Sequence, residues 1–176
     1  MQYFAGIVPP NEYKHKVIKF QQKWDSNNMW RLVEPHITVK AQSGLTADLS
    51  WLDAIRRVCA STEPFTVSLI HPETFADAVP HLSVKSSRLR LFHEQLVEAV
   101  SPPPEVMERY MEMDQFIPHL TLGQTNWGMT PQEIMEMTAN ASIELAPFPS
   151  FTVDFIRVYQ ETEKDIYKPY EDIRLD

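Results

Sequence analysis

One short phrase occurs twice in the sequence, and this repeat restricts the fold more than any other feature. The copies span residues 35–39, which read Pro-His-Ile-Thr-Val, and residues 118–122, which read Pro-His-Leu-Thr-Leu. β-Branched and aliphatic residues dominate both copies, and turn-forming residues follow each, as is typical of strands. Because side chains alternate between the two faces of a strand, the histidine and threonine of each copy share one face. The sequence therefore predicts two short strands that each have a polar face and a buried face.

The elements around the two phrases repeat as well. A strand, a helix, a histidine strand, a helix and a Phe-Thr-Val strand follow one another over residues 3–70 and again over residues 81–159. The two histidines lie 83 positions apart, and the Phe-Thr-Val segments, which begin at Phe65 and Phe151, lie 86 apart. Two copies are too few for a solenoid. We therefore expect an α+β fold of two pseudo-symmetric lobes, each a small, mostly antiparallel sheet with outer helices, facing each other across a central cleft.

The expected organisation is a single bilobal domain over residues 1–176. Lobe one covers about residues 1–75 and lobe two about residues 76–160, and the polar tail 161–176 is expected to be loosely ordered. A chain of this length fits one domain and buries roughly 70% of its unfolded surface, so the core needs no covalent staples.

Apolar residues at helical spacing predict the helices of both lobes. A fourth helix is expected from residue 130 to about residue 140, because Thr130-Pro131-Gln132-Glu133 combines an N-cap threonine, a proline at the first position and a glutamate at the third. The acidic, methionine-rich segment 105–117 is expected to be a loop or a short helix. The remaining elements are helices at about 11–24, 48–60 and 89–100, and strands at 3–8, 65–70, 81–85 and 151–159.

Charge and cysteine content exclude several classes of function. The formal net charge of −8 argues against a long nucleic acid held along its backbone, because such binding needs a basic surface, but it permits a small phosphate ligand in a local pocket. The single Cys59 excludes an internal disulfide, and no Cys/His cluster has zinc spacing. No stretch approaches the length of a membrane span, and the apolar segment 3–8 lacks the basic flank of a signal peptide. We expect a cytoplasmic protein with no membrane partner.

The residue types in the two phrases suit phosphodiester chemistry. Cleavage of a phosphodiester needs a base for the nucleophile and an acid for the leaving oxygen. Imidazole has an unperturbed pKa of about 6.5, so His36 and His119 could supply one neutral and one protonated ring near neutral pH. The hydroxyls of Thr38 and Thr121 can donate hydrogen bonds to the non-bridging oxygens, whose charge rises in the transition state. Such a site needs neither a metal nor a cofactor.

The paired phrases resemble the signature of the 2H phosphoesterase superfamily, which includes the bacterial 2′-5′ RNA ligase-like proteins and the cyclic nucleotide phosphodiesterases. The resemblance spans nearly the whole chain, because residues 3–10 also resemble the family's first strand and the turn after it. It implies the bilobal architecture, catalytic roles for His36 and His119, and phosphate binding by Thr38 and Thr121.

Four further residues are candidates for substrate binding, although each type is more often solvated or structural. Lys40 follows the first phrase, Lys85 ends a neighbouring strand, and Arg157 and Tyr159 occupy same-face positions on the last strand. After the second phrase, where a basic residue would be expected, the chain has Gly123-Gln124. This departure argues further against a large RNA substrate.

A third phrase, His81-Leu82-Ser83, also follows a proline and matches the pattern of a histidine and a hydroxyl two residues on. In the internal repeat, however, it aligns with the first strand of lobe one. We therefore expect His81 to lie outside the catalytic pair.

The sequence thus predicts a metal-independent phosphoesterase that acts on a 2′,3′-cyclic phosphate or a 2′-5′ phosphodiester of a nucleotide or short RNA end, with 2′-5′ ligation as the reverse reaction. Two alternatives stay open. One is a nucleotide- or RNA-end-binding protein that has the same cleft and no turnover. The other is a metal site built from His36 and His119. The oligomeric state also stays open.

Overall fold

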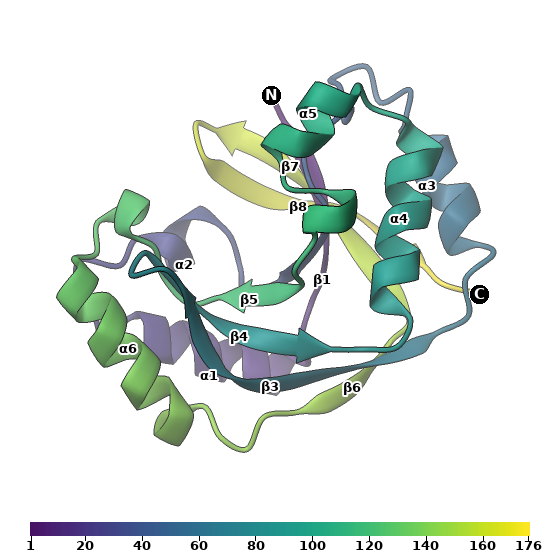
Figure 1. Cartoon of the computed structure of the whole chain (residues 1–176). Coiled ribbons are helices and arrows are strands. Elements are labelled where there is room, and N and C mark those ends of the chain that lie inside the picture. Colours follow the sequence, from purple (N-terminus) through teal and green to yellow (C-terminus); the bar gives the residue numbers. More distant parts are fainter.

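Eight antiparallel strands form one continuous, curled sheet in the computed structural model, which describes residues 1–176 (Figure 1). The strands lie in the order β6-β3-β4-β5-β2-β1-β7-β8. Their bounds are Tyr3–Ile7 (β1), Ile37–Lys40 (β2), Phe65–Phe75 (β3), Val79–Lys85 (β4), His119–Thr121 (β5), Ser150–Val153 (β6), Phe155–Glu163 (β7) and Ile166–Arg174 (β8).

The two histidine strands are neighbours at the middle of this sheet. β2 and β5 pair antiparallel with Ile37 opposite Leu120, and directly opposed residues point to the same face. Ile37, Val39, Leu120 and Leu122 are all fully buried. The predicted alternation is therefore confirmed, and it places the histidines and threonines of both strands on the opposite face from this core.

The sheet corrects the expectation of two separate small sheets. β3, which follows the first histidine strand along the chain, pairs with β4 and β6, and β7 pairs with β1. Each half of the sheet therefore contains a strand from each half of the sequence. The direct pairing of β2 with β5 then joins the two halves without an edge between them. The α+β class is confirmed, whereas the division into two lobes near residue 75 stays a prediction.

Six helices and two 3₁₀ turns surround the sheet as two groups (Figure 1). α3 and α4 pack together and contact β8 and β2, whereas α6 contacts β3 and β4. The Tyr13 hydroxyl of α1 donates a hydrogen bond of 2.9 Å to the carbonyl of Leu145 after α6, so α1 belongs to the second group. The bounds are Asn11–Gln21 (α1), Met29–Leu32 (α2), Leu52–Cys59 (α3), Leu89–Val100 (α4), Pro104–Arg109 (α5), Met113–Gln115 (η1), Thr125–Trp127 (η2) and Pro131–Glu144 (α6).

The four predicted helices are present as α1, α3, α4 and α6. The Thr130 side chain accepts from the backbone N–H of Glu133, and the Glu133 carboxylate accepts from the N–H of Thr130 at 2.8 Å, which confirms the predicted start of α6. The segment 105–117 contains η1 and all of α5 except its first residue, Pro104. None of the helices is both long and apolar enough to cross a lipid bilayer.

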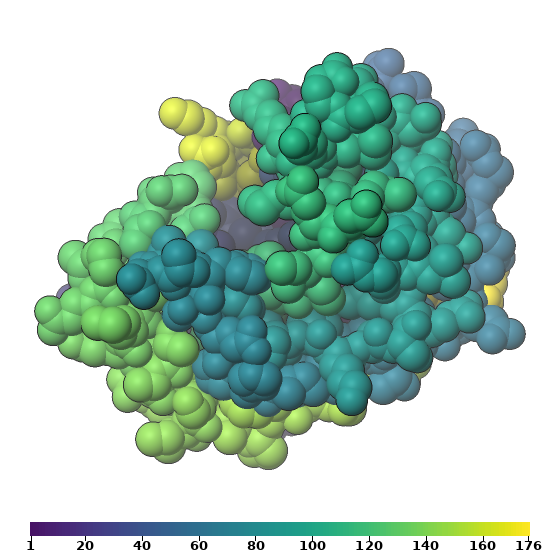
Figure 2. Space-filling view, viewed as in Figure 1, coloured from purple at the N-terminus to yellow at the C-terminus, as the bar shows by residue number.

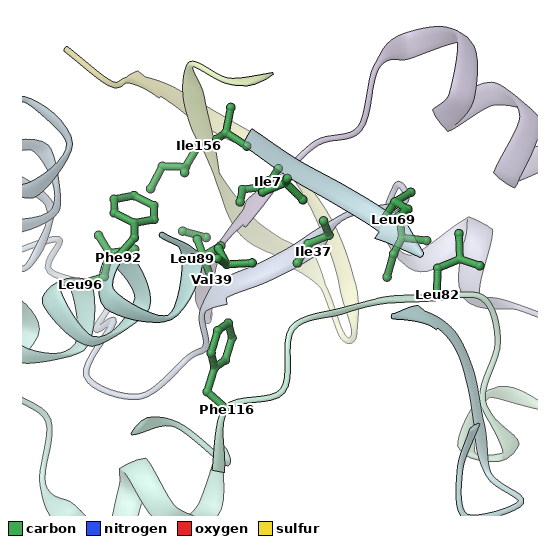
Figure 3. Close-up of a cluster of buried hydrophobic side chains, with 14 of the residues drawn as sticks. Ile7, Ile37, Val39, Leu69, Leu82, Leu89, Phe92, Leu96, Phe116 and Ile156 are labelled. Atoms are coloured by element: carbon green, nitrogen blue, oxygen red, sulfur yellow. The ribbon is translucent and has the colours of Figure 1, made fainter. Parts of the chain in front are cut away.

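The buried face of the sheet packs against the apolar stripe of α4. Figure 3 shows Val39 of β2 close to Leu89, with Phe92 and Leu96 on the same helix. All four side chains are at most 1% exposed. Burial of one such side chain is worth about 1.5–3 kcal/mol, so this contact is a main source of stability for the central strands.

The chain beyond residue 160 is ordered, contrary to the expected loose tail. β8 pairs with β7 from Phe155 opposite Arg174 to Glu163 opposite Ile166. Ile173 and Leu175 are 7% and 5% exposed and join the core, and this burial fixes an otherwise polar edge strand. The single strand expected at 151–159 is two strands in the structure. β6 pairs with β3, and β7 pairs with β1.

Candidate active site

The polar face of the two histidine strands lines a hollow in the surface. One cavity of about 160 Å³ is lined by His36 and Thr38, and a second of about 400 Å³ is lined by Thr38, His119 and Thr121. Thr38 borders both, so the cavities adjoin. Figure 2 shows the hollow, with the segment around residues 105–120 above it and the N-terminal part of the chain as its floor. The structure therefore brings the two predicted motifs to one place.

Both imidazole rings are held in the same way by the backbone. The Nδ1 atom of His36 lies 2.8 Å from the carbonyl oxygen of Glu34, and that of His119 lies 2.7 Å from the carbonyl oxygen of Ile117. A carbonyl only accepts, so each Nδ1 carries a hydrogen. In both cases the acceptor residue precedes the proline of the motif, where the backbone is biased toward an extended conformation. Each Nε2 is thereby left without a protein partner and available for proton transfer.

The two threonine hydroxyls are also unengaged. Thr38 and Thr121 are half-buried, and neither side chain has a hydrogen bond to the protein. The site therefore presents two hydroxyls and two Nε2 atoms that make no hydrogen bonds within the protein. Such a set can surround the oxygens of one phosphate group.

The surroundings of the two rings lower both pKa values. Burial lowers the pKa of His36, and the hydrogen bond to the Glu34 carbonyl and the charge of the Glu34 carboxylate partly oppose this effect. The pKa of His119 is lowered to about 4, mainly by burial and in smaller part by the positive charges that His81 and His36 carry when protonated. The unliganded site therefore holds both rings mainly neutral at pH 7, and a bound phosphate anion would favour protonation.

Aromatic side chains pack against each ring. Phe4 lies with its ring centroid 4.8 Å from that of His36, and Phe75 lies 4.9 Å from that of His119 in an edge-to-face arrangement. Gly6 of β1 allows His36 to approach, because a Cβ atom at this position would lie 3.2 Å from the His36 ring. These contacts restrict the rotation of both imidazoles.

His81 lies beside the pair but is closed off from solvent. In the β4–β5 pairing it stands opposite Thr121, and its ring centroid is 5.3 Å from that of His119. The ring stacks on Phe75 at 4.0 Å and the residue is 1% exposed. β4 flanks β5 as β1 flanks β2, in agreement with the alignment of the internal repeat.

The two candidate lysines do not reach the cavities. Lys40 is 0% exposed, and its ammonium group lies 2.7 Å from the carboxylate of Glu112, which is 1% exposed. The Lys40 ammonium also donates to the carbonyl and the hydroxyl of Ser43. Lys85 is exposed at the end of β4 and lines neither cavity. This geometry gives Lys40 a structural role and gives Lys85 no contact with the histidines.

Arg157 and Tyr159 meet on one carboxylate behind His36. The Arg157 guanidinium lies 2.7 Å from Glu34 Oε1, and the Tyr159 hydroxyl donates to the same oxygen at 2.9 Å. Arg157 also forms a two-bond ion pair with Asp172 at 2.6 and 2.7 Å. Arg157 is therefore connected to His36 through Glu34, whereas Tyr159 also packs its ring against the imidazole. The sequence interpretation missed Glu34, although this residue directly precedes the first motif.

No group of three or more His, Cys, Asp or Glu side chains is arranged to hold a metal ion.

Two more residues near the site, Glu112 and Phe75, were not predicted from the sequence. Glu112 falls in the segment 105–117, which was expected to be a loop or a short helix, and Phe75 lies beyond the expected end of its strand.

Comparison with known proteins agrees with this fold. A profile of the 2′-5′ RNA ligase superfamily matches residues 9–165. Among solved structures, the protein TT0787 of Thermus thermophilus superposes with a TM-score of 0.63 at 18% identity, covering 99% of this chain and 98% of that one. E. coli LigT complexed with NADP+ gives 0.63 at 18% identity, with 99% and 97% covered, and its complex with 3′-AMP gives 0.59 at 18% identity, also with 99% and 97% covered. No curated protein sequence matches the chain. The profile covers most of the chain, and the protein therefore belongs to the 2′-5′ RNA ligase superfamily of 2H phosphoesterases.

Proposed function

We propose that the protein is a metal-independent phosphoesterase that cleaves a 2′,3′-cyclic phosphate or a 2′-5′ phosphodiester of a nucleotide or short RNA end. The observation that carries this proposal is the placement of two imidazoles with free Nε2 atoms and two free hydroxyls around adjoining cavities. Membership of a phosphoesterase superfamily supports the reaction class. The LigT complexes with 3′-AMP and ATP support a small nucleotide as the substrate.

The proposed reaction is an in-line displacement at phosphorus. One neutral imidazole takes the proton of the attacking water or hydroxyl as the new P–O bond forms. The other, protonated imidazole gives its Nε2 proton to the leaving oxygen as the old P–O bond breaks. Thr38 and Thr121 donate hydrogen bonds to the non-bridging oxygens as their charge rises. The two rings end with exchanged protonation states, and solvent restores them.

A panel of 2′,3′-cyclic nucleotides and 2′-5′ linked dinucleotides, with identification of the products, tests this proposal. We expect His36→Ala and His119→Ala each to lower turnover by roughly 10²–10⁴-fold, the usual effect of removing a positioned acid or base. The double variant should lose much less than the product of the two single losses, because both groups act in one transition state. Near-normal turnover in either single variant would contradict the assignment.

His81→Phe is the matched control for these variants. The substitution removes a third imidazole from the same face of the sheet while a ring still packs on Phe75. We expect its turnover to stay within a few-fold of the parent, because the buried His81 has no access to substrate. Activity that disappears in EDTA and returns with a divalent cation would instead favour a metal site, and tight binding without turnover of any panel member would favour a nucleotide-binding protein.

A further inference from the structure

The two catalytic candidates differ in one respect that their shared motif does not reveal. A carboxylate, that of Glu34, stands behind His36, whereas the titratable side chain beside His119 is a second imidazole, that of His81. The backbone hydrogen bonds at Nδ1 are equivalent. Burial lowers the pKa of both rings, and the rings differ in the charged neighbour that opposes or adds to this effect.

Glu34 is built to stay ionised. Lys14 of α1 lies 2.7 Å from Glu34 Oε2, and Arg157 and Tyr159 of β7 bond Oε1 at 2.7 and 2.9 Å. Burial alone would raise the pKa of the Glu34 carboxyl, but these three hydrogen bonds outweigh that effect and hold the pKa below its usual range. The side chains of Glu34, Lys14 and Arg157 are 19%, 12% and 19% exposed, so water screens this network only partly.

The network is connected to the His36 ring at several points. The Glu34 carbonyl oxygen accepts the Nδ1 hydrogen of His36. The Tyr159 ring stacks on Phe4 with centroids 4.7 Å apart, and both rings pack against the imidazole, at 5.4 and 4.8 Å. One residue therefore supplies the acceptor that orients His36, the charge behind it, and the anchor for an aromatic ring at its side.

From this geometry we propose that Glu34 is a positioning residue that keeps the shared proton of the catalytic pair on His36. His36 is then the acid that protonates the leaving oxygen, and the neutral His119 is the base that takes the proton of the nucleophile. This assignment of roles rests on the function proposed above, whereas the location of the proton can be measured without turnover.

Other charged and titratable groups near His36 complete the electrostatic setting. Asp165 and Tyr167 line the small cavity with it, Asp172 pairs with Arg157, and His119 stands across the shared threonine. Burial is the largest influence on the pKa of His36 and lowers it, and the influences that raise it both come from Glu34. A change in the charge at residue 34 should therefore move the proton affinity of His36 selectively.

The first test is a side-chain NMR titration of the histidines in the unmodified protein. We expect His36 to titrate above His119, with the hydrogen of the neutral ring on Nδ1 in both. In Glu34→Gln the amide oxygen can still accept from Arg157 and Tyr159, but the charge is gone, and we expect the pKa of His36 to fall by about one unit. Lys14→Met leaves Glu34 with one fewer cation and should shift the pKa of His36 in the opposite direction. This second variant keeps the test decisive if Glu34→Gln fails to fold.

The matched control is Glu171→Gln, which also removes a carboxylate from an arginine ion pair, the one with Arg56 of α3. We expect no shift of the His36 pKa in this variant. If His119 titrates above His36 in the parent, or if neither Glu34→Gln nor Lys14→Met moves the pKa of His36, the proposal is wrong.

Kinetics separate a positioning role from a purely structural one. In Glu34→Gln we expect kcat to fall about tenfold with KM nearly unchanged, and the alkaline limb of the kcat profile to move down by about one pH unit, since that limb reports loss of the proton from His36. An equal loss of activity at every pH, with an unmoved limb, would indicate a structural role and overturn the proposal. If the NMR shifts appear as expected but no panel substrate is turned over, the proposed function fails while the proton placement stands.

Discussion

Thr38 and Thr121 each present a hydroxyl that has no hydrogen-bond partner in the protein, and we expect a phosphate oxygen to be that partner. Thr→Ser at either position keeps the donor and should be tolerated. Thr→Val keeps the β-branched shape and strand propensity but leaves a charged oxygen unpaired. A hydrogen bond to a charged group is worth about 1.5–3 kcal/mol, so the valine variants should lose roughly ten- to a hundred-fold in kcat/KM. Serine and valine variants with equal activity would show that these hydroxyls only pack.

At the scale of elements, the segment from α5 to η1 forms one wall of the larger cavity and is held to β2 by the buried Lys40–Glu112 pair. Glu112 also accepts from the backbone N–H of Ala41 at 3.0 Å. Glu112→Gln leaves the buried ammonium uncompensated and should cost about 3–5 kcal/mol of unfolding free energy, measured by urea denaturation. The double variant Lys40→Met/Glu112→Met removes both charges and should be more stable than Glu112→Gln. A single variant as stable as the parent would show that the pair contributes nothing to docking of the segment.

At the scale of the whole molecule, burial lowers the pKa of four histidines, so stability depends on pH. Between pH 6.5 and about 4 the unfolded chain binds more protons than the folded one, and the free energy of unfolding should therefore fall as the pH falls through this range. The shift at His119 alone, to a pKa of about 4, corresponds to about 2–3 kcal/mol after allowance for its partial exposure. Urea denaturation from pH 7 to pH 4.5 measures this loss, and His119→Phe should reduce the slope. Stability that is constant or rises toward pH 4.5 would contradict the prediction. The four residues are His36, His81, His93 and His119.

Features that depend on local pattern could be predicted from the sequence. Alternation placed the polar and buried faces of both histidine strands, and the Thr130–Glu133 capping box located the start of α6. The internal repeat also aligned His81 with the first strand of the chain, and β4 indeed flanks β5 as β1 flanks β2. These features follow from the periodicity of the backbone and from hydrogen bonds between residues a few positions apart, both of which can be read from a single chain.

Which strands are neighbours and which charges meet depends on the tertiary fold. Periodicity tells which face of a strand is buried but not which strand lies beside it. The sequence therefore could not predict that β3 pairs with β4, that β7 pairs with β1, or that β8 pairs with β7. The ion pairs of Lys40 with Glu112 and of Arg157 with Glu34 join residues 72 and 123 positions apart. Burial and these distant partners, more than residue type, give Lys40 a structural place in the core and Arg157 a place behind His36.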